Sequence, residues 1–167
     1  MSEAKLNDFA AQLRQQVQVA REAQQHQQAE LQRQATQEAE WDQRRRQRVE
    51  ELSQAIPRRF DEAAKIADGA LQFSGPSRDT VGGGIDVTAY DLYWNDKALP
   101  PLRGLRIAIN PLKGAIHWVW ILNNQEVGRM AVDPLGFDLA LLDQLILALA
   151  DQQRWKQGRV PTISVSH

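Results

Sequence analysis

Residues 105–132 read LRIAINPLKGAIHWVWILNNQEVGRMAV, and this stretch decides the fold. Apolar and polar side chains alternate over 105–109 and again over 126–132, which is the period of a strand with one buried face. Residues 115–122 are apolar on both faces, as in a central strand. The tetrapeptide PLKG and the dipeptide NN supply turn chemistry between these runs. The stretch therefore predicts an antiparallel meander.

The segments on either side of the meander complete a small domain. Residues 85–94 alternate in the same way and predict a fourth strand, whereas residues 137–155 have the period of a helix. We therefore predict an α+β fold in which a meander of about four strands packs on a C-terminal helix. One helix leaves the other sheet face uncovered, and either residues 58–68 or another subunit would have to cover it. Residues 160–166 suit an edge strand or an arm.

Residues 1–56 differ in composition from the rest of the chain. They hold 14 of the 20 glutamines and neither glycine nor proline. Alanine, glutamine, glutamate, arginine and leucine all favour helices, so we predict one long, coiled-coil-like helix that ends before Pro57. The predicted segments after it are a short helix and connector, a Gly/Ser/Pro linker and the α+β domain. The long helix spans 1–56, the short helix and connector 57–73, the linker 74–84 and the α+β domain 85–167.

The apolar positions of the long helix predict association between chains. Leu6, Ala10, Leu13, Val17 and Ala20 follow the alternating four- and three-residue spacing of a coiled-coil seam. Glutamines interrupt the seam before Leu31, after which it shifts register and becomes charged in the middle. A stutter or a different partner would account for the shift, and a solvated amphipathic helix is the alternative to association. The predicted oligomerisation residues are Leu6, Leu13, Val17, Leu31, Val49, Leu52 and Ile56.

Two other groups of residues suggest binding surfaces. Aromatic residues on neighbouring strands, together with one leucine of the C-terminal helix, predict a face that contacts a protein partner, because aromatics are enriched at interface hot spots. This face comprises Tyr90, Tyr93, Trp94, Trp118, Trp120 and Leu147. An arginine cluster would suit phosphate, although acidic residues at helical spacing can pair with it. The cluster comprises Arg44, Arg45, Arg46, Arg48, Arg58 and Arg59.

No pattern in the sequence identifies catalytic chemistry. There is no cysteine, and the three histidines are far apart in sequence, so we expect neither a metal site nor a cofactor. His117 lies in the middle of a predicted strand. Five carboxylates of the domain could form an unrecognised acidic site if two of them met in space. They are Asp86, Asp91, Asp96, Asp133 and Asp138.

Charge and hydropathy narrow the class of protein. A formal net charge of −1 argues against a globally basic nucleic-acid packager. The most apolar stretch is too short for a membrane span, and the first thirty residues lack the apolar core of a signal peptide, so we expect a cytoplasmic protein. The leading hypothesis is a non-catalytic, self-associating scaffold or adaptor whose α+β domain binds a protein. The alternatives are a nucleic-acid-associated accessory subunit and an enzyme subunit.

Overall fold

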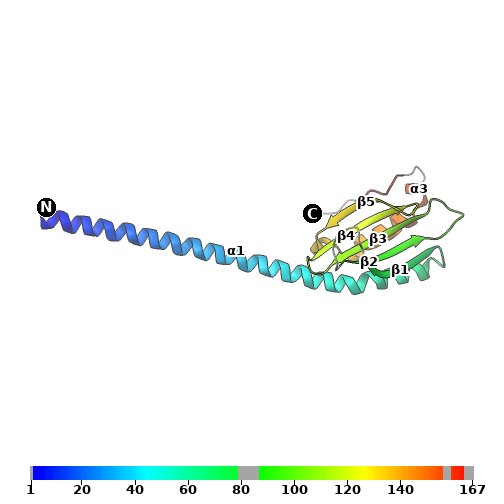
Figure 1. Cartoon of the computed structure of the whole chain (residues 1–167), viewed down its shortest axis with the longest axis horizontal. Coiled ribbons are helices and arrows are strands. Elements are labelled where there is room, and N and C mark those ends of the chain that lie inside the picture. Colours follow the sequence, from blue (N-terminus) through cyan, green and yellow to red (C-terminus); the bar gives the residue numbers. More distant parts are fainter. Residues whose placement is uncertain (1, 79–86, 156–158, 164–167) are drawn as a thin grey trace. The chain divides into compact units, whose positions relative to one another are not determined.

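The computed structural model describes residues 2–78, 87–155 and 159–163. The chain divides into two compact units, Met1–Trp41 and Asp42–His167. The first helix, α1 (Glu3–Ile66), contributes to both units (Figure 1). The first unit is helical throughout its described residues from Glu3 onward. The second unit contains the remaining elements.

The second unit has the predicted α+β architecture, with five strands instead of about four. The strands form one antiparallel sheet in the order β1-β2-β3-β4-β5, which is a simple meander. Their bounds are Leu71–Arg78 for β1, Thr88–Trp94 for β2, Arg103–Asn110 for β3, Ala115–Leu122 for β4 and Gln125–Val132 for β5. As predicted from its apolar faces, β4 is flanked by a strand on each side.

The additional strand occupies part of the predicted linker. Residues 74–78 belong to β1, which pairs with β2, so the linker prediction is wrong for them; residues 79–84 lie outside the described part of the chain. Glycine and proline suggested a loop, but an edge strand tolerates proline because one side of its backbone has no strand partner. Gly75 has a φ of 136°, and a Cβ there would lie 3.0 Å from the Ala89 carbonyl oxygen.

Three further helical segments follow the sheet. A 3₁₀ turn, η1 (Pro134–Gly136), precedes α2 (Leu139–Ala150), and α3 (Gln152–Trp155) follows. Asp138 caps α2, because its carboxylate accepts a hydrogen bond from the Leu141 amide at 2.7 Å. In the arm at residues 159–163, Val160 and Ile163 pack against the core.

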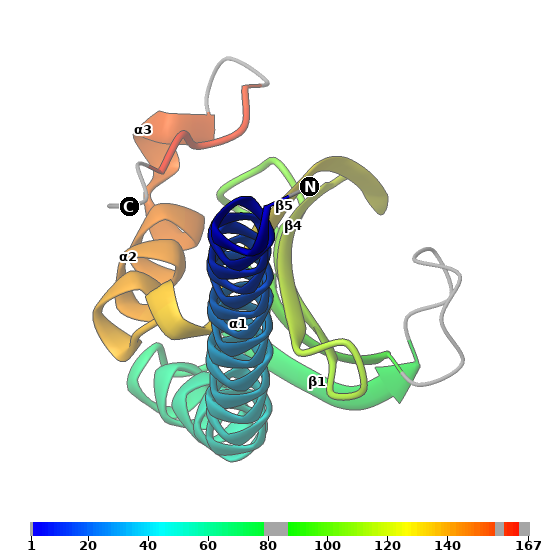
Figure 2. The same cartoon turned by 90° about the vertical axis from the view of Figure 1, so that its left-hand side faces the viewer.

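Both long helices of this unit pack on the same face of the sheet. Figure 2 shows residues 42–66 of α1 and the whole of α2 on one side of the curved sheet. Alternate residues of β2, β3 and β4 point to that side and form one core with the two helices. The core includes Val49, Leu52, Ile56, Phe60, Leu92, Leu105, Ile107, Trp118, Trp120, Leu142, Leu145 and Leu149. Residues 58–68 therefore share this face with α2 and do not cover the opposite one.

The opposite face of the sheet carries a network of charged side chains. Arg106 on β3 makes two hydrogen bonds to the Asp91 carboxylate on β2, at 2.7 and 3.0 Å. The same guanidinium reaches Glu126 on β5 at 3.4 Å, and Glu126 pairs with Arg129 at 3.3 Å. The Tyr93 hydroxyl donates to Asp91 at 3.0 Å. Salt bridges thus connect three strands on the face that the helices leave open.

The helix boundary predicted at Pro57 is wrong, because α1 continues through this residue to Ile66. A proline inside a helix removes one backbone donor and typically costs about 3 kcal/mol. Ile56 and Phe60 on either side of Pro57 are both fully buried in the core. Burial of these two side chains holds the helix in place, so packing outweighs the local preference to stop.

Candidate interaction surfaces

The N-terminal unit carries an apolar stripe along an otherwise polar helix. Leu6, Phe9, Leu13 and Val17 have exposed fractions between 41 and 59%. Among the described residues of 2–41, every side chain is exposed except that of Ala10, which is half-buried. Leu31, another predicted oligomerisation residue, is also exposed. The stripe thus remains available to a partner outside the chain.

The last three predicted oligomerisation residues have a different role. Val49, Leu52 and Ile56 are at most 1% exposed and belong to the core of the second unit. Their spacing in the sequence is that of a coiled-coil seam, but these side chains pack against the sheet of the same chain. The assignment of these three residues to association between chains is therefore wrong.

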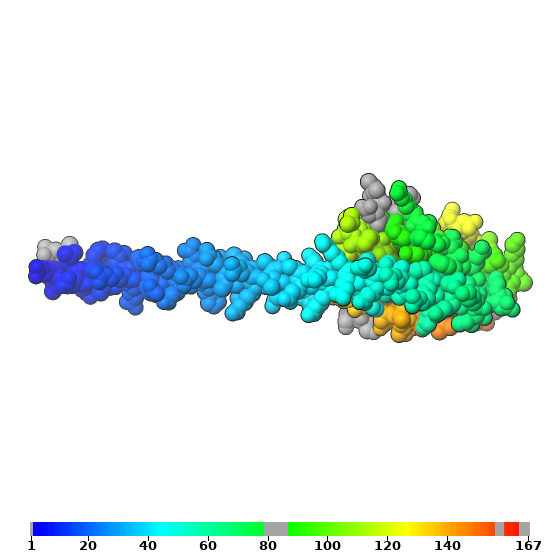
Figure 3. All heavy atoms as spheres, turned by 90° about the horizontal axis from the view of Figure 1, so that it is seen from below, coloured from blue at the N-terminus to red at the C-terminus, as the bar shows by residue number. Residues whose placement is uncertain are grey.

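An apolar groove lies between the end of α1 and α2. It has a volume of about 430 Å³, and Ala63, Ile66, Ile146 and Leu147 contribute to its lining. Ile66 is 85% exposed and Leu147 is 69% exposed, which are the two highest values among the large hydrophobic residues described. In Figure 3 the teal end of α1 lies beside orange atoms of α2. Two neighbouring helices thus present their most exposed apolar side chains at one place.

A bidentate ion pair lies at the rim of the groove. Arg59 on α1 donates to both carboxylate oxygens of Asp143 on α2 at 2.7 Å, and it also contacts Glu62 at 3.3 Å. The hydrogen bonds to Asp143, followed by the one to Glu62, raise the pKa of Arg59 above its ordinary value. The pair connects the two helices and gives the apolar groove a charged border.

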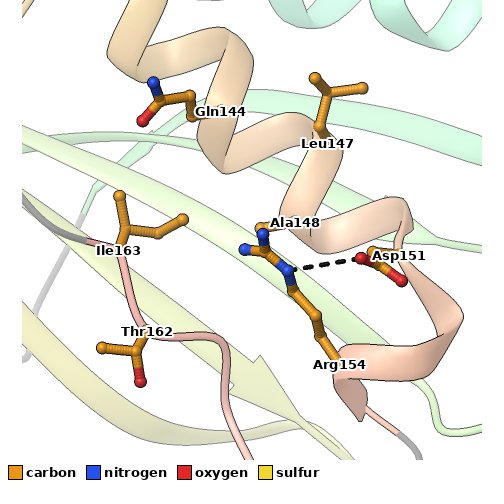
Figure 4. A pocket seen from close by; sticks show the side chains of 7 residues that line it. All are labelled: Gln144, Leu147, Ala148, Asp151, Arg154, Thr162 and Ile163. Carbon is orange, nitrogen blue, oxygen red and sulfur yellow. Dashed lines mark ion pairs between the residues drawn. The ribbon is translucent and has the colours of Figure 1, made fainter.

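A second pocket lies on the other side of Leu147, between α2 and the C-terminal arm (Figure 4). Its volume is about 460 Å³, and its lining includes Gln144, Thr162 and Ile163. Arg154 and Asp151 form an ion pair at 3.3 Å across one end. Leu147 lines both hollows, so it stands on the ridge between an apolar groove and a polar pocket.

The predicted aromatic face does not form one surface. Tyr90, Trp118 and Trp120 are buried in the core beneath the helices, so their assignment to a partner face is wrong. Period two places these side chains on the inner face, and the helices cover that face. Tyr93 and Trp94 are half-buried and line a pocket of about 280 Å³ at the end of the sheet. Of the predicted set, only Leu147 is largely exposed.

Arg103 is a buried cation beside that smaller pocket. Its guanidinium carbon lies 4.4 Å from the ring centre of Trp94 and 5.7 Å from that of Trp155. Nε donates to the Leu149 carbonyl at 2.7 Å, near the C-terminus of α2, where a positive charge is favourable. Burial lowers the pKa of Arg103, and the charge of Asp151 opposes this effect. These contacts join the sheet to the end of α2.

The arginine cluster contributes to the internal contacts of residues 42–167. Arg45 pairs with Asp133 at 3.4 Å, and Arg48 donates to the Phe137 carbonyl at 2.8 Å. Arg59 holds Asp143, as described above. Arg44, Arg46 and Arg58 are exposed. Three of the six arginines thus bind α1 to η1 or α2, so the cluster does not present one continuous basic surface.

The residues considered for catalysis also have structural contacts. Asp91 pairs with Arg106, and Asp96 accepts a hydrogen bond from the Ala98 amide. Asp133 caps η1, as Asp138 caps α2. His117 lies in β4 opposite Ala108 and Ala131, and Asp86 lies outside the described residues. Within the described ranges, no three histidine, aspartate or glutamate side chains gather as a metal site would require.

Sequence reasoning missed Phe9 and Ile66. Phe9 is beside the seam, three residues after Leu6, and its helical spacing could have identified it. The sequence predicts that Ile66 belongs to a separate short helix after Pro57, and no feature of it marks Ile66 as part of a groove.

None of the described helices combines the length and the apolarity that a bilayer-spanning segment requires. In comparisons with known proteins, no family model, no curated protein and no solved structure matches this chain.

Proposed function

We propose that this protein is a non-catalytic, self-associating adaptor. In this proposal, the N-terminal half of α1 pairs between chains, and the unit of residues 42–167 binds a protein partner at the groove between α1 and α2. The observation that carries the proposal is the exposed apolar stripe at Leu6, Phe9, Leu13 and Val17. A cytoplasmic location belongs to the same proposal and is supported by a chain that needs no disulfide.

Energetics favour association through the stripe. A single helix gains most of its stability in proteins from packing an amphipathic face, not from intrinsic propensity. Fully burying one valine, leucine or phenylalanine side chain contributes roughly 1.5–3 kcal/mol. Association costs about 4–15 kcal/mol, so several such residues from each chain are needed to offset it. The stripe supplies four large apolar side chains on each copy.

Two valines on the same helix allow a matched test of self-association. Val17 lies on the seam, whereas Val19 lies off the seam and is 58% exposed. Val17→Asp should shift the protein toward monomer because it places a charge in the paired interface. Val19→Asp should leave the mass of the oligomer equal to that of the parent, because the side chain at position 19 stays in water. Light scattering across a size-exclusion peak would measure both variants and the parent.

The same measurement has results that contradict the proposal. A parent protein that is monomeric at every concentration, or equal behaviour of the two variants, would contradict association through the seam. Absorbance at 260 and 280 nm across the peak would also reveal bound nucleic acid. An oligomer that carries nucleic acid and dissociates with rising salt would favour the nucleic-acid-associated function instead.

The groove is the part of the proposal that concerns a protein partner. Exposed apolar side chains that converge from two helices fit an apolar segment of another protein, and the charges at the rim would orient it. Leu147→Glu should abolish binding of a co-purifying partner, because the charge would enter the groove. Leu112→Glu is the matched control, since Leu112 is similarly exposed at 67% and does not line the groove. Equal retention of the partner by both variants would contradict a role for the groove.

A further inference from the structure

We infer that residues 6–31 pair with the same residues of a second copy as a parallel, in-register, two-stranded coiled coil. The inference rests on the self-association proposed above and specifies its geometry. It depends on the placement of glutamine and arginine around the exposed stripe, not on the stripe alone. Two copies can bury the stripe in either orientation, so the polar residues must decide between them.

The heptad positions follow from the alternating four- and three-residue spacing of the seam. Position d is occupied by Leu6, Leu13, Ala20 and Gln27, and position a by Ala10, Val17, Gln24 and Leu31. These residues lie within one uninterrupted helix and, apart from Ala10, are exposed. A β-branched residue at a combined with leucine at d favours two parallel strands. Val17 at position a and Leu13 at position d are such a combination, and both lie in the apolar part of the seam between Leu6 and Ala20.

The two glutamines of the seam favour parallel alignment in register. In that arrangement Gln24 faces Gln24 of the second copy, and Gln27 faces Gln27. An amide side chain carries both donors and an acceptor, so identical amides can satisfy each other inside a seam. The antiparallel arrangement that overlaps the whole segment places Gln24 opposite Leu13 and Gln27 opposite Ala10. Each buried amide would then lack a partner, which costs about 1–3 kcal/mol per group.

The residues that flank the seam favour the same orientation. Arg14 and Arg21 both occupy position e. In the overlapped antiparallel pair, e positions face each other along one side of the interface, so Arg14 of each copy meets Arg21 of the other. In the parallel pair, each e position instead faces the g position that precedes it by five residues. Arg14 then meets Phe9, and Arg21 meets Gln16, so no like charges are opposed. This arrangement also gives Phe9 a cation as its neighbour.

The absence of cysteine from the chain makes a direct test straightforward. The test uses full-length Ala10→Cys and Gln27→Cys variants, each oxidised alone and then mixed, with a size tag on one variant. A disulfide requires Cβ atoms within about 3.5–4.5 Å. In the parallel pair each cysteine faces its own counterpart, so each variant alone should form a dimer of doubled mass on a non-reducing gel. Val19→Cys, off the seam, should remain uncrosslinked.

Each other result overturns the inference in a recognisable way. Cross-linking only in the mixture would show the antiparallel pair, because residues 10 and 27 face each other there. A dimer by light scattering in which neither cysteine cross-links would show association through another surface. A monomer at every concentration would remove the proposed self-association together with its geometry. Only cross-linking of both single variants, with Val19→Cys silent, supports the parallel pair.

Discussion

Ser53, Pro57 and Tyr90 explain how α1 passes through a proline. In a regular helix the amide at position 57 would donate to the Ser53 carbonyl, but proline has no amide hydrogen. The Tyr90 hydroxyl of β2 donates to that carbonyl at 3.2 Å instead. A tyrosine hydroxyl is protonated at neutral pH and can donate, and burial raises the pKa of Tyr90 further above its ordinary value. A side chain of the sheet thus replaces the bond that the proline removes.

A double-mutant cycle would test this replacement. Tyr90→Phe should lower the free energy of unfolding by about 1–3 kcal/mol, because it leaves a carbonyl without a donor. In a Pro57→Ala background the amide of residue 57 can donate to Ser53, so Tyr90→Phe should cost clearly less. Urea unfolding of the four proteins would measure the difference. Equal costs in the two backgrounds would mean that the hydroxyl does not compensate for the proline.

Within α1, a single helix carries two apolar seams with different partners. The first, from Leu6 to Leu31, is exposed, whereas the second, with Val49, Leu52 and Ile56, is buried against the sheet. The sequence predicted both seams and a shift of register between them. It could not predict that the second seam packs within the chain, because the spacing of apolar residues is the same for either partner.

Within α2, adjacent residues separate the core face from the exposed face. Ile146 is 9% exposed and packs in the core, whereas Leu147 is 69% exposed. Ile146→Ala should lower the free energy of unfolding by about 2–4 kcal/mol, because it leaves a cavity. Leu147→Ala should change it by no more than about 0.5 kcal/mol, as expected for a surface position. Chemical unfolding of both variants would measure this, and similar losses would mean that Leu147 is buried in solution.

The sheet was largely predictable at this scale, but its first strand was not. The period of two, the apolar run at residues 115–122 and the turn residues PLKG and NN identified β2 to β5, because each of these signals is local. β1 contains Ser-Gly-Pro-Ser, which is typical of a loop. It is a strand because its backbone pairs with β2. This stabilisation comes from the neighbouring strand β2, so the amino-acid pattern of residues 71–78 does not reveal it.

For the whole molecule, the boundary between the two units falls after Trp41 and not at Pro57. A chain of residues 42–167 should therefore fold cooperatively. A chain of residues 57–167 should not, because it lacks Val49, Leu52 and Ile56. Loss of each such side chain costs roughly 2–5 kcal/mol, and a typical domain has only about 5–15 kcal/mol of stability in total.

Near-ultraviolet circular dichroism and thermal unfolding would compare the two truncated chains. The buried tryptophans Trp118, Trp120 and Trp155 should give a native-like signal in the longer chain only. Cooperative unfolding of the shorter chain at the same temperature would contradict the boundary. It would mean that residues 42–56 are a dispensable part of α1.

The sequence by itself determined the α+β class, the meander, the long helix and the exposed apolar seam at its N-terminal end. Each of these follows from periodicity or composition within a short window, where the physical cause is local. Only the tertiary structure decided that α1 continues through Pro57, that its second seam is core and that Ile66 joins Leu147 in a groove. Those outcomes depend on the surface that each segment meets, and hydrophobic burial favours any apolar surface that fits, whatever its distance in sequence.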